Sequence, residues 1–477
     1  MNKEVRVRFA PSPTGYLHLG SLRTALFNYL FARHHNGKFI LRIEDTDQSR
    51  KVEGAVENLI NILNEMGLNY DEGPGVGGEF GPYFQSERLD IYKKYCDELL
   101  ASGHAYYAFE TAEELDEMRK VQQMQGKQTM YDRRARVLTE NEVNEKLASG
   151  IPYVIRLKVP LDSEIRFTDI IRGNVKIDTN LVDDQVLLKS DGFPTYHLAN
   201  VIDDHLMQIT HIIRGEEWLT SVPKHIILYN AFGWEVPQMA HVPLILNPDK
   251  TKLSKRQGDV ATEDYLKKGY LKEALLNFMA LLGWNPGDGE EKEIFTKAEL
   301  IEKFTIERVN SAGAVFNVEK LNWMNGEYIK NYDVDELTVL LIPYLNAGGI
   351  DTSDIIKTKR VIFAIRNYIN KLDEAAEQAK VYYSDVKLND EQTAIISADT
   401  SKQVFKALAS KIEAMLEITT ENFKPVLSEV QKETGVKGKN LFMPVRLALT
   451  GKEHGPELGM IAYVLGKEEV LKRLNLN

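Results

Sequence analysis

The chain has a single cysteine, Cys96, among its 477 residues. One cysteine excludes an intrachain disulfide framework and any metal site that needs several cysteine ligands. The sequence also lacks an uninterrupted apolar stretch long enough to span a bilayer. Residues 1–5 lack the apolar core of a secretory signal. These absences predict a cytoplasmic protein that does not enter a membrane.

The chain also lacks an excess of basic charge, since its formal net charge is −11 at pH 7. Proteins that bind nucleic acid non-specifically are usually basic, because they neutralise phosphates. The acidic balance therefore argues against non-specific RNA affinity, although it allows a local basic face. Residues 436–440 and 467–473 could contribute to such a face, but taken alone they resemble ordinary surface lysines.

Internal repeats and low-complexity tracts are absent as well. Hydrophobic residues make up 43% of the chain and charged residues 27%, which is typical of globular proteins. A chain of 477 residues is long enough for several domains.

The first 50 residues have the pattern of a nucleotide-binding α/β unit. Residues 5–9 alternate with period two, which predicts a strand, and residues 39–43 predict a second one. Between them, a loop with two prolines precedes apolar residues at helical spacing, with Ser21 as the expected N-cap and Gly37 near the helix end. The pattern predicts strand–loop–helix–strand.

The sequence His18-Leu19-Gly20-Ser21 opens this predicted helix. The N-terminus of a helix offers unpaired amides and a partial positive charge, which suit phosphate. Gly20 lets a nucleotide lie close to the backbone, and His18 could stabilise charge that develops on the phosphates. The alternative is that His18 only caps a turn under the helix.

A second motif, from Lys252 through Leu253 and Ser254 to Lys255 and Arg256, lies in a polar loop. Lys255 could neutralise the negative charge of a departing pyrophosphate, and Lys252 and Arg256 could add to the same positive electrostatic field. A solvated basic loop is the alternative. The order and pairing of both motifs favour a site that binds ATP and transfers its adenylyl group to a carboxylate.

Three charged residues, Arg8, Glu44 and Arg214, stand near the ends of predicted strands that are remote in sequence. Strand ends of this kind meet at one edge of a sheet, where α/β proteins bind ligands. The planar guanidinium group of arginine can donate two parallel hydrogen bonds to a carboxylate. The three residues could therefore bind a substrate with carboxylates and an ammonium group, or each could simply cap a strand in water.

Several segments resemble the bacterial glutamyl-tRNA synthetases, which are class I aminoacyl-tRNA synthetases. Besides the two motifs above, they are IEDTD at 43–47, YFQSER at 83–88, DGFPTYHLAN at 191–200 and IRGEEW at 213–218. The resemblance runs through essentially the whole chain. It implies an α/β fold, a Rossmann-like catalytic domain with an inserted α+β acceptor-binding domain, followed by an all-α anticodon-binding region. The implied boundaries are 1–95 and 189–256 for the catalytic halves, 96–188 for the insertion, 257–332 for a stem-contact domain and 333–477 for the helical region.

The resemblance also implies the site residues. The catalytic set is His18, Gly20, Lys252, Lys255 and Arg256. The glutamate set is Arg8, Ala10, Ser12, Glu44, Tyr196, Asn200 and Arg214. The ATP set is His18, Gly20, Glu217, Trp218, Leu253 and Lys255. Glu44 would meet the ammonium group and Arg214 the side-chain carboxylate, although sequence does not settle which arginine takes which carboxylate.

The expected function is that of a glutamate–tRNA ligase, which forms glutamyl adenylate from L-glutamate and ATP and transfers the glutamyl group to tRNA(Glu). We expect Mg²⁺ with ATP, a monomer, and no structural zinc, because residues 105–109 (AYYAF) stand where some relatives have their first zinc cysteines. The alternatives are a glutaminyl enzyme, a small-molecule nucleotidyltransferase and a non-catalytic RNA-binding relative. From about residue 333 onward helix-like segments dominate, whereas most glutaminyl enzymes have β-barrels there. This pattern and Arg214 disfavour the first alternative, and the long helical extension disfavours the second. The intact catalytic motifs disfavour the third.

In strict bacterial relatives, an arginine in the first helical domain reads the third anticodon base. The corresponding stretch here is 365–372, and our alignment places Tyr368 at the reading position with Arg366 two residues away. Tyrosine mainly stacks on bases, so relaxed anticodon discrimination is the expectation. The alternative is a packed helix with Tyr368 in its core.

Overall fold

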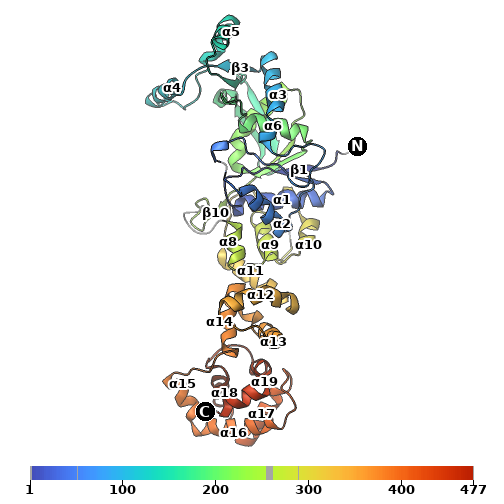
Figure 1. Ribbon diagram of the computed structural model, residues 1–477, viewed down its shortest axis with the longest axis vertical. Helices are drawn as coiled ribbons and strands as arrows, with labels where there is room; N and C mark the ends of the chain where they lie inside the picture. Colours follow the sequence, from blue (N-terminus) through green and yellow to red (C-terminus); the bar gives the residue numbers. More distant parts are fainter. Residues whose placement is uncertain (1–2, 51, 254–260, 288, 476–477) are drawn as a thin grey trace. The chain divides into compact units, whose positions relative to one another are not determined.

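The computed structural model describes residues 3–50, 52–253, 261–287 and 289–475 (Figure 1). The chain forms two compact units. The first comprises Met1–Asp264 and Leu276–Asn317, and the second comprises Tyr265–Leu275 and Val318–Asn477. The expected stem-contact region thus contributes residues to both units, and the finer division into five domains stays a prediction.

The first unit is built on parallel strands, as the N-terminal pattern predicts. β1 pairs in parallel with β2, and β8 pairs in parallel with β9. The backbone N–H of Thr210 donates to the carbonyl of Arg6 at 2.9 Å, which joins β1 to the start of β8. β5 continues on the far side of β9 and pairs with β6. The bounds are β1 Arg6–Phe9, β2 Lys38–Leu41, β5 Glu164–Asp169, β6 Gly173–Asp178, β8 His211–Gly215 and β9 Gln238–Val242.

Helix α1 (Leu19–His34) follows β1 and is buried along most of its length. We expected Ser21 at its N-cap, and this was wrong, because the helix begins three residues earlier than that, at Leu19, with His18 at the N-cap position. The Leu22 N–H donates to the His18 carbonyl at 2.8 Å and closes the first turn. Burial of Leu19 and Leu22 against the core outweighs the capping preference of serine.

The segment between the two halves of this sheet carries its own small antiparallel sheet, with strand order β3–β4–β7. Its core forms part of a larger apolar cluster that also contains residues of β8 and β9. Helices α4 and α5 both begin with a capping box, formed by Thr111 with Glu114 and by Thr139 with Glu142. The bounds are β3 Ala105–Ala108, β4 Val154–Leu157, β7 Val186–Leu188, α3 Leu89–Ala101, α4 Ala112–Met124 and α5 Glu140–Ala148.

The remaining elements of the first unit are mostly helices, of which α8 and α9 also contribute residues to the second unit. They are α2 Ala55–Glu65, α6 Tyr196–Leu206, α7 Val222–Ala231, α8 Thr262–Lys267, α9 Lys272–Leu281 and α10 Lys297–Lys303, with the short strands β10 Ile245–Leu246 and β11 Ala314–Val315. β10 and β11 pair in parallel.

Within the described residues 318–475 of the second unit, all regular elements are helices, which confirms the all-α prediction. A continuous apolar cluster that includes Leu341, Val361, Leu408 and Val445 forms its core. The helices are α11 Val318–Asn331, α12 Val334–Ala347, α13 Ile355–Ile365, α14 Ala375–Ala379, α15 Asp390–Ser397, α16 Asp399–Glu413, α17 Phe423–Thr434, α18 Lys439–Thr450 and α19 Leu458–Asn475.

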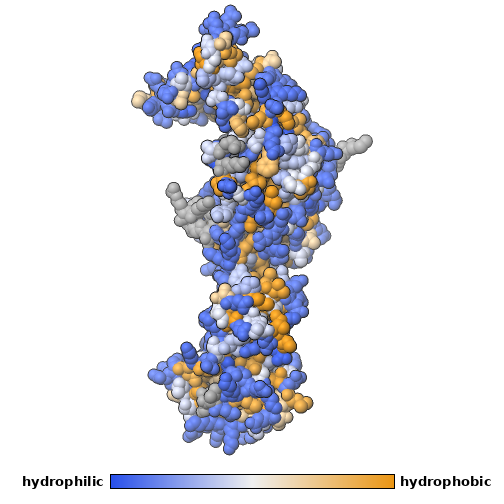
Figure 2. Space-filling view, viewed as in Figure 1, coloured by the Kyte–Doolittle hydropathy of each residue, from blue (hydrophilic) through white to orange (hydrophobic). Residues whose placement is uncertain are grey.

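Among the described helices, none combines the length and apolar character needed to cross a bilayer. On the face shown in Figure 2, hydrophobic residues are interspersed with hydrophilic ones.

Candidate active site

A cavity of about 600 Å³ opens in the first unit where β1, β8 and the N-terminus of α1 come together. Every predicted catalytic, glutamate and ATP residue that the structure describes lines it. They are Arg8, Ala10, Ser12, His18, Gly20, Glu44, Tyr196, Asn200, Arg214, Glu217, Trp218, Lys252 and Leu253. Lys255 and Arg256 lie outside the described residues. The role of each residue stays a prediction.

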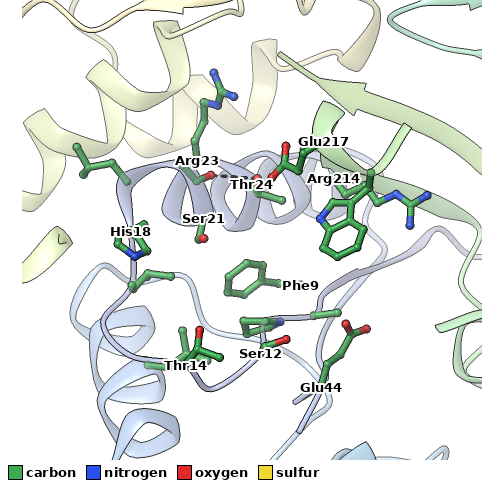
Figure 3. Close-up of a pocket in the computed structure, with 18 of the residues that line it drawn as sticks. Phe9, Ser12, Thr14, His18, Ser21, Arg23, Thr24, Glu44, Arg214 and Glu217 are labelled. Carbon is green, nitrogen blue, oxygen red and sulfur yellow. Dashed lines mark hydrogen bonds between the residues drawn. The ribbon is translucent and has the colours of Figure 1, made fainter. Parts of the chain in front are cut away.

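The labelled side chains lie at different ends of this cavity (Figure 3). His18 and Ser21 lie at one end, whereas Glu44 and Arg214 lie at the other. Ser12 lies between the two groups. The cavity thus has a helix N-terminus at one end, where unpaired amides suit phosphate, and charged side chains at the other.

At the phosphate-binding end, the backbone of His18 is extended and that of Gly20 is already helical. A Cβ atom added to Gly20 would meet no other atom within 4 Å, so there is open space above this turn. Leu253 lines the cavity, and Ala261 forms a β-bridge with His18. Leu253 of the second motif thus lines the same cavity as His18, and the first described residue after that motif contacts His18 directly.

At the charged end, Asp204 of α6 holds two arginines. It accepts from Nε of Arg8 at 3.0 Å and from Nη1 of Arg42 at 2.7 Å. All three side chains are almost fully buried. Burial raises the pKa of Asp204, but Arg8 and Arg42 outweigh it and hold that pKa below its ordinary value. The carboxylate is therefore charged, and it positions Arg8 at the cavity wall.

Glu44 extends the same network. Its Oε1 accepts from Nη2 of Arg42 at 3.1 Å and from Nδ2 of Asn200 at 3.4 Å. Burial raises the pKa of Glu44, and Arg42 and Arg8 only partly oppose this. A bound ammonium group would stabilise the charged form, because it would supply a further cation next to this buried carboxylate.

Arg214, from β8, is 5% exposed. Its Nη1 donates to the Tyr196 hydroxyl at 2.6 Å, and its Nε donates to Nε2 of His241 at 3.1 Å. Its Nη2 is buried and has no hydrogen-bond partner among the described residues. A buried cationic donor without an acceptor is unfavourable, and because Arg214 lines the cavity, this atom can donate to an acceptor that a bound ligand brings.

Sequence reasoning missed Arg42 and Asp204, which hold Arg8 and Glu44, and His241, which contacts Arg214. It also missed Arg23 of α1, which lines the cavity and donates to the carbonyls of Pro243 and Leu282. Burial lowers the pKa of Arg23 to about 10.

Arg42 precedes Glu44 by two residues in a strand-like stretch. This spacing puts both side chains on one face of the strand and could have identified Arg42 as a site residue. Asp204 and His241 contact arginines distant in sequence, so no local pattern could have identified them.

Residues 4–323 match the profile of the class I tRNA synthetases for glutamate and glutamine, catalytic domain. The chain belongs to this family. Residues 336–476 of this synthetase match an anticodon-binding domain.

The similarity to individual family members covers nearly the whole chain. The synthetase is 49% identical to the glutamate–tRNA ligase of Clostridioides difficile, covering 98% of both chains. It is also 49% identical to the glutamate–tRNA ligase of Chlorobaculum parvum, covering 99% of this chain and 97% of that one. A crystal structure of a glutamate tRNA ligase from Elizabethkingia meningosepticum in complex with its amino acid is 39% identical, with a TM-score of 0.91 and 99% of each chain covered.

The predicted anticodon residues of the synthetase belong to the second unit. Arg366 and Tyr368 form a 3₁₀ turn, Arg366–Tyr368, directly after α13. Tyr368 is 46% exposed, so the alternative of a packed helix with Tyr368 in its core is wrong. The Arg366 guanidinium lies over the Phe363 ring, 4.7 Å from its centroid. The Tyr368 side chain is accessible to a ligand, whereas Arg366 is half-buried. Whether either residue reads a base stays a prediction.

Proposed function

We propose that this synthetase is a glutamate–tRNA ligase that forms glutamyl adenylate and then glutamyl-tRNA(Glu). The observation that carries the choice of amino acid is Arg214, whose buried Nη2 lacks an acceptor among the described residues. A carboxylate supplies a charged acceptor, whereas the amide of glutamine supplies a neutral one. The names of the relatives, glutamate–tRNA ligases at 49% identity, support the same choice.

Each charge of glutamate has a complementary group at the charged end of the cavity. Arg8 and Arg214 would bind the two carboxylates, and Glu44 would bind the ammonium group. Asn200 donates to Glu44 and lines the cavity, while Tyr196 contacts Arg214. Ala10 and Ser12 lie on the loop after β1, where small side chains leave room for the substrate.

The adenylate forms when a carboxylate oxygen attacks the α-phosphorus of ATP and the bond to pyrophosphate breaks. His18 would donate to the phosphates in the transition state, with Gly20 leaving room for them beside the helix N-terminus. Lys252, Lys255 and Arg256 would neutralise the leaving pyrophosphate, and Glu217, Trp218 and Leu253 would contact the nucleotide. A hydroxyl of the terminal tRNA ribose then attacks the adenylate carbonyl, and AMP leaves.

The Mg²⁺ that accompanies ATP would be held by the phosphate oxygens. Among the described residues there is no group of three or more His, Cys, Asp or Glu side chains placed to hold a metal. For zinc, the proposal is that none is needed in the inserted segment. There the buried Asp184 accepts from the Tyr106 hydroxyl at 2.5 Å and from both Nε and Nη2 of Arg136 at 2.6 and 2.5 Å, which links β3 to the chain before β7. Metal analysis of enzyme purified in metal-free buffer should find less than stoichiometric zinc.

The second unit supports tRNA as the acceptor of the glutamyl group. A nucleotidyltransferase that acts on small molecules needs no anticodon-binding domain, and a match to one covers residues 336–476. The complete set of described catalytic residues at one cavity disfavours a non-catalytic relative. We propose further that the enzyme acts on tRNA(Glu) as a monomer in the cytoplasm.

Glutamate-dependent exchange of pyrophosphate into ATP, measured with and without tRNA(Glu), tests the proposal. We expect exchange with glutamate that requires tRNA, and much weaker exchange with glutamine. Exchange with glutamine alone would identify a glutaminyl enzyme. Tight tRNA binding with no exchange would identify a non-catalytic relative, and exchange that ignores tRNA altogether would favour a nucleotidyltransferase.

A further inference from the structure

A chain of three buried side chains runs from Arg214 away from the cavity. Nε of Arg214 donates to Nε2 of His241 at 3.1 Å, and Nδ1 of His241 lies 2.6 Å from Oδ2 of Asp169. His241 and Asp169 are both fully buried. Neither lines the cavity, and neither was among the predicted site residues.

The hydrogen bonds of Asp169 determine its direction and charge. Its Oδ1 accepts from the backbone N–H groups of Ile171 at 3.0 Å, Arg172 at 2.9 Å and His241 at 3.3 Å. Burial raises the pKa of Asp169, but the bonds from His241 and Arg172 outweigh it and hold the pKa below its ordinary value. A charged carboxylate with one oxygen already occupied leaves the other as an acceptor for His241.

This arrangement selects one form of the imidazole. Asp169 accepts, so Nδ1 of His241 carries the proton, and Nε2 is then the lone-pair acceptor that the Arg214 donor requires. Burial lowers the pKa of His241, and the Arg214 cation beside it acts in the same direction although Asp169 opposes them. A neutral ring with its proton on Nδ1 satisfies both contacts, whereas an imidazolium would repel Arg214.

We propose that His241, oriented by Asp169, is a positioning residue that fixes the guanidinium of Arg214 so that one edge stays available to the side-chain carboxylate of glutamate. His241 occupies the Nε–H, and Tyr196 occupies one hydrogen of Nη1. The second hydrogen of Nη1 and the hydrogens of Nη2 remain, and a carboxylate at the end of the guanidinium can accept two parallel bonds from these two nitrogens. The inference rests on the assignment of Arg214 proposed above.

The positions of the three residues show why such a support is useful. Arg214 and His241 face each other on the paired strands β8 and β9, and Asp169 is at the end of β5, which pairs with β9. An arginine side chain has several rotatable bonds, and a misplacement of about 1 Å can cost roughly a hundredfold in activity. Rigid strands on two sides remove that freedom before glutamate arrives.

Two substitutions at one position test this role. In His241→Asn the amide can replace Nδ1 and bond Asp169, but it does not reach Arg214. In His241→Gln the amide oxygen reaches close to the Nε2 position and can accept from Arg214. We expect the Asn variant to raise the glutamate KM at least about tenfold in pyrophosphate exchange, with the ATP KM changed less than about twofold. The Gln variant should recover most of the glutamate affinity.

A merely structural role would give a different pattern. Equal losses in the Asn and Gln variants, or parallel rises of the glutamate and ATP KM values, would overturn the proposal. Arg214→Ala distinguishes a failure of the support by His241 from a failure of the assignment of Arg214 to glutamate. If Arg214→Ala raises the glutamate KM and His241→Asn does not, the support fails while the site assignment stands. If Arg214→Ala has no effect, the assignment itself fails.

A measurement on the unmutated enzyme covers the case in which the variants do not fold. Nitrogen-15 NMR of histidine-labelled protein, with His241 assigned by the signal lost in His241→Gln or by sequential assignment, reports the tautomer. We expect a neutral ring protonated on Nδ1 near neutral pH. A ring protonated on Nε2, or on both nitrogens, would contradict the proposed contact with Arg214.

Discussion

Arg214 in the first unit and Arg366 in the second are both predicted to recognise a ligand, yet their surroundings differ. Arg214 is 5% exposed and is held by hydrogen bonds to Tyr196 and His241. Arg366 lies in a 3₁₀ turn and contacts the ring of Phe363. Directed hydrogen bonds fix both the position and the angle of a guanidinium, whereas contact over a ring face is less directional. The catalytic cavity is therefore the less tolerant of the two regions.

The largest expected effect concerns the buried charges of the cavity. Asp204→Asn removes the carboxylate that pairs with Arg8 and Arg42, and breaking a buried pair of this kind costs about 3–5 kcal/mol. Denaturant unfolding should show this loss. Asp335→Asn is the matched control in the second unit, because Asp335 pairs with Lys359 at the surface and exposed pairs contribute less than about 1 kcal/mol. Equal losses in the two variants would remove the contrast between the regions.

The same carboxylate gives a pH dependence with a definite sign. Because the pKa of Asp204 is below its ordinary value in the folded state, its contribution is present above the unfolded pKa and is lost as pH falls through the lowered folded pKa. The stability difference between the parent enzyme and Asp204→Asn should therefore shrink on acidification below about pH 4. A difference that grows on acidification would contradict this assignment.

The next effect is on the chemical step. His18→Ala should slow adenylate formation by two to three orders of magnitude, since loss of one transition-state donor costs roughly 3–4 kcal/mol. Lys255→Ala is expected to act similarly. Single-turnover measurement of adenylate formation with tRNA present gives the rate, and thermal unfolding should be unchanged. His104→Ala, which removes an exposed histidine of the same unit, is the control. Near-normal rates in both motif variants would refute their catalytic assignment.

Arg214→Gln comes next and tests specificity. It should raise the glutamate KM roughly 30-fold or more and narrow the preference for glutamate over glutamine, because loss of one partner of a buried charge pair costs about 2–5 kcal/mol. Competition between the two amino acids in pyrophosphate exchange measures the preference. Arg166→Gln, on the exposed part of β5, should leave it unchanged. Unaltered discrimination in the Arg214 variant would assign this role to another residue.

The smallest effect is expected in the second unit. Tyr368→Ala should weaken tRNA(Glu) binding by about 1–3 kcal/mol, the range for loss of base stacking.

Because stacking tolerates several bases, we also expect the parent enzyme to charge purified glutamine tRNAs with glutamate to a measurable extent. Charging of tRNAs with both glutamine anticodons is the decisive assay. If neither is charged, discrimination is strict, and the assignment of Tyr368 to the third anticodon base is wrong.

Sequence patterns predicted the features that depend on residues close together in the sequence, but not those that depend on residues far apart in it. The parallel strands, the helix after the proline loop and the helical C-terminal part follow from periodicity, which reports which face of an element is buried. The start of α1 was misplaced because burial of Leu19 competes with the local preference of Ser21, and only packing decides between them. The burial of a short turn such as Arg366–Tyr368 likewise depends on its neighbours in space.

By itself, the sequence determined the chemical groups of this enzyme and their order along the chain: a histidine at a helix start, basic residues in a later loop, and arginines and a glutamate near strand ends. Only the tertiary structure decided which of these charges are held in place. Asp204 lies far along the chain from Arg8 and Arg42, and Asp169 reaches Arg214 only through His241 on a neighbouring strand. Such contacts follow from strand pairing and helix packing. A local sequence pattern does not reveal them, because the two partners lie in different segments of the chain.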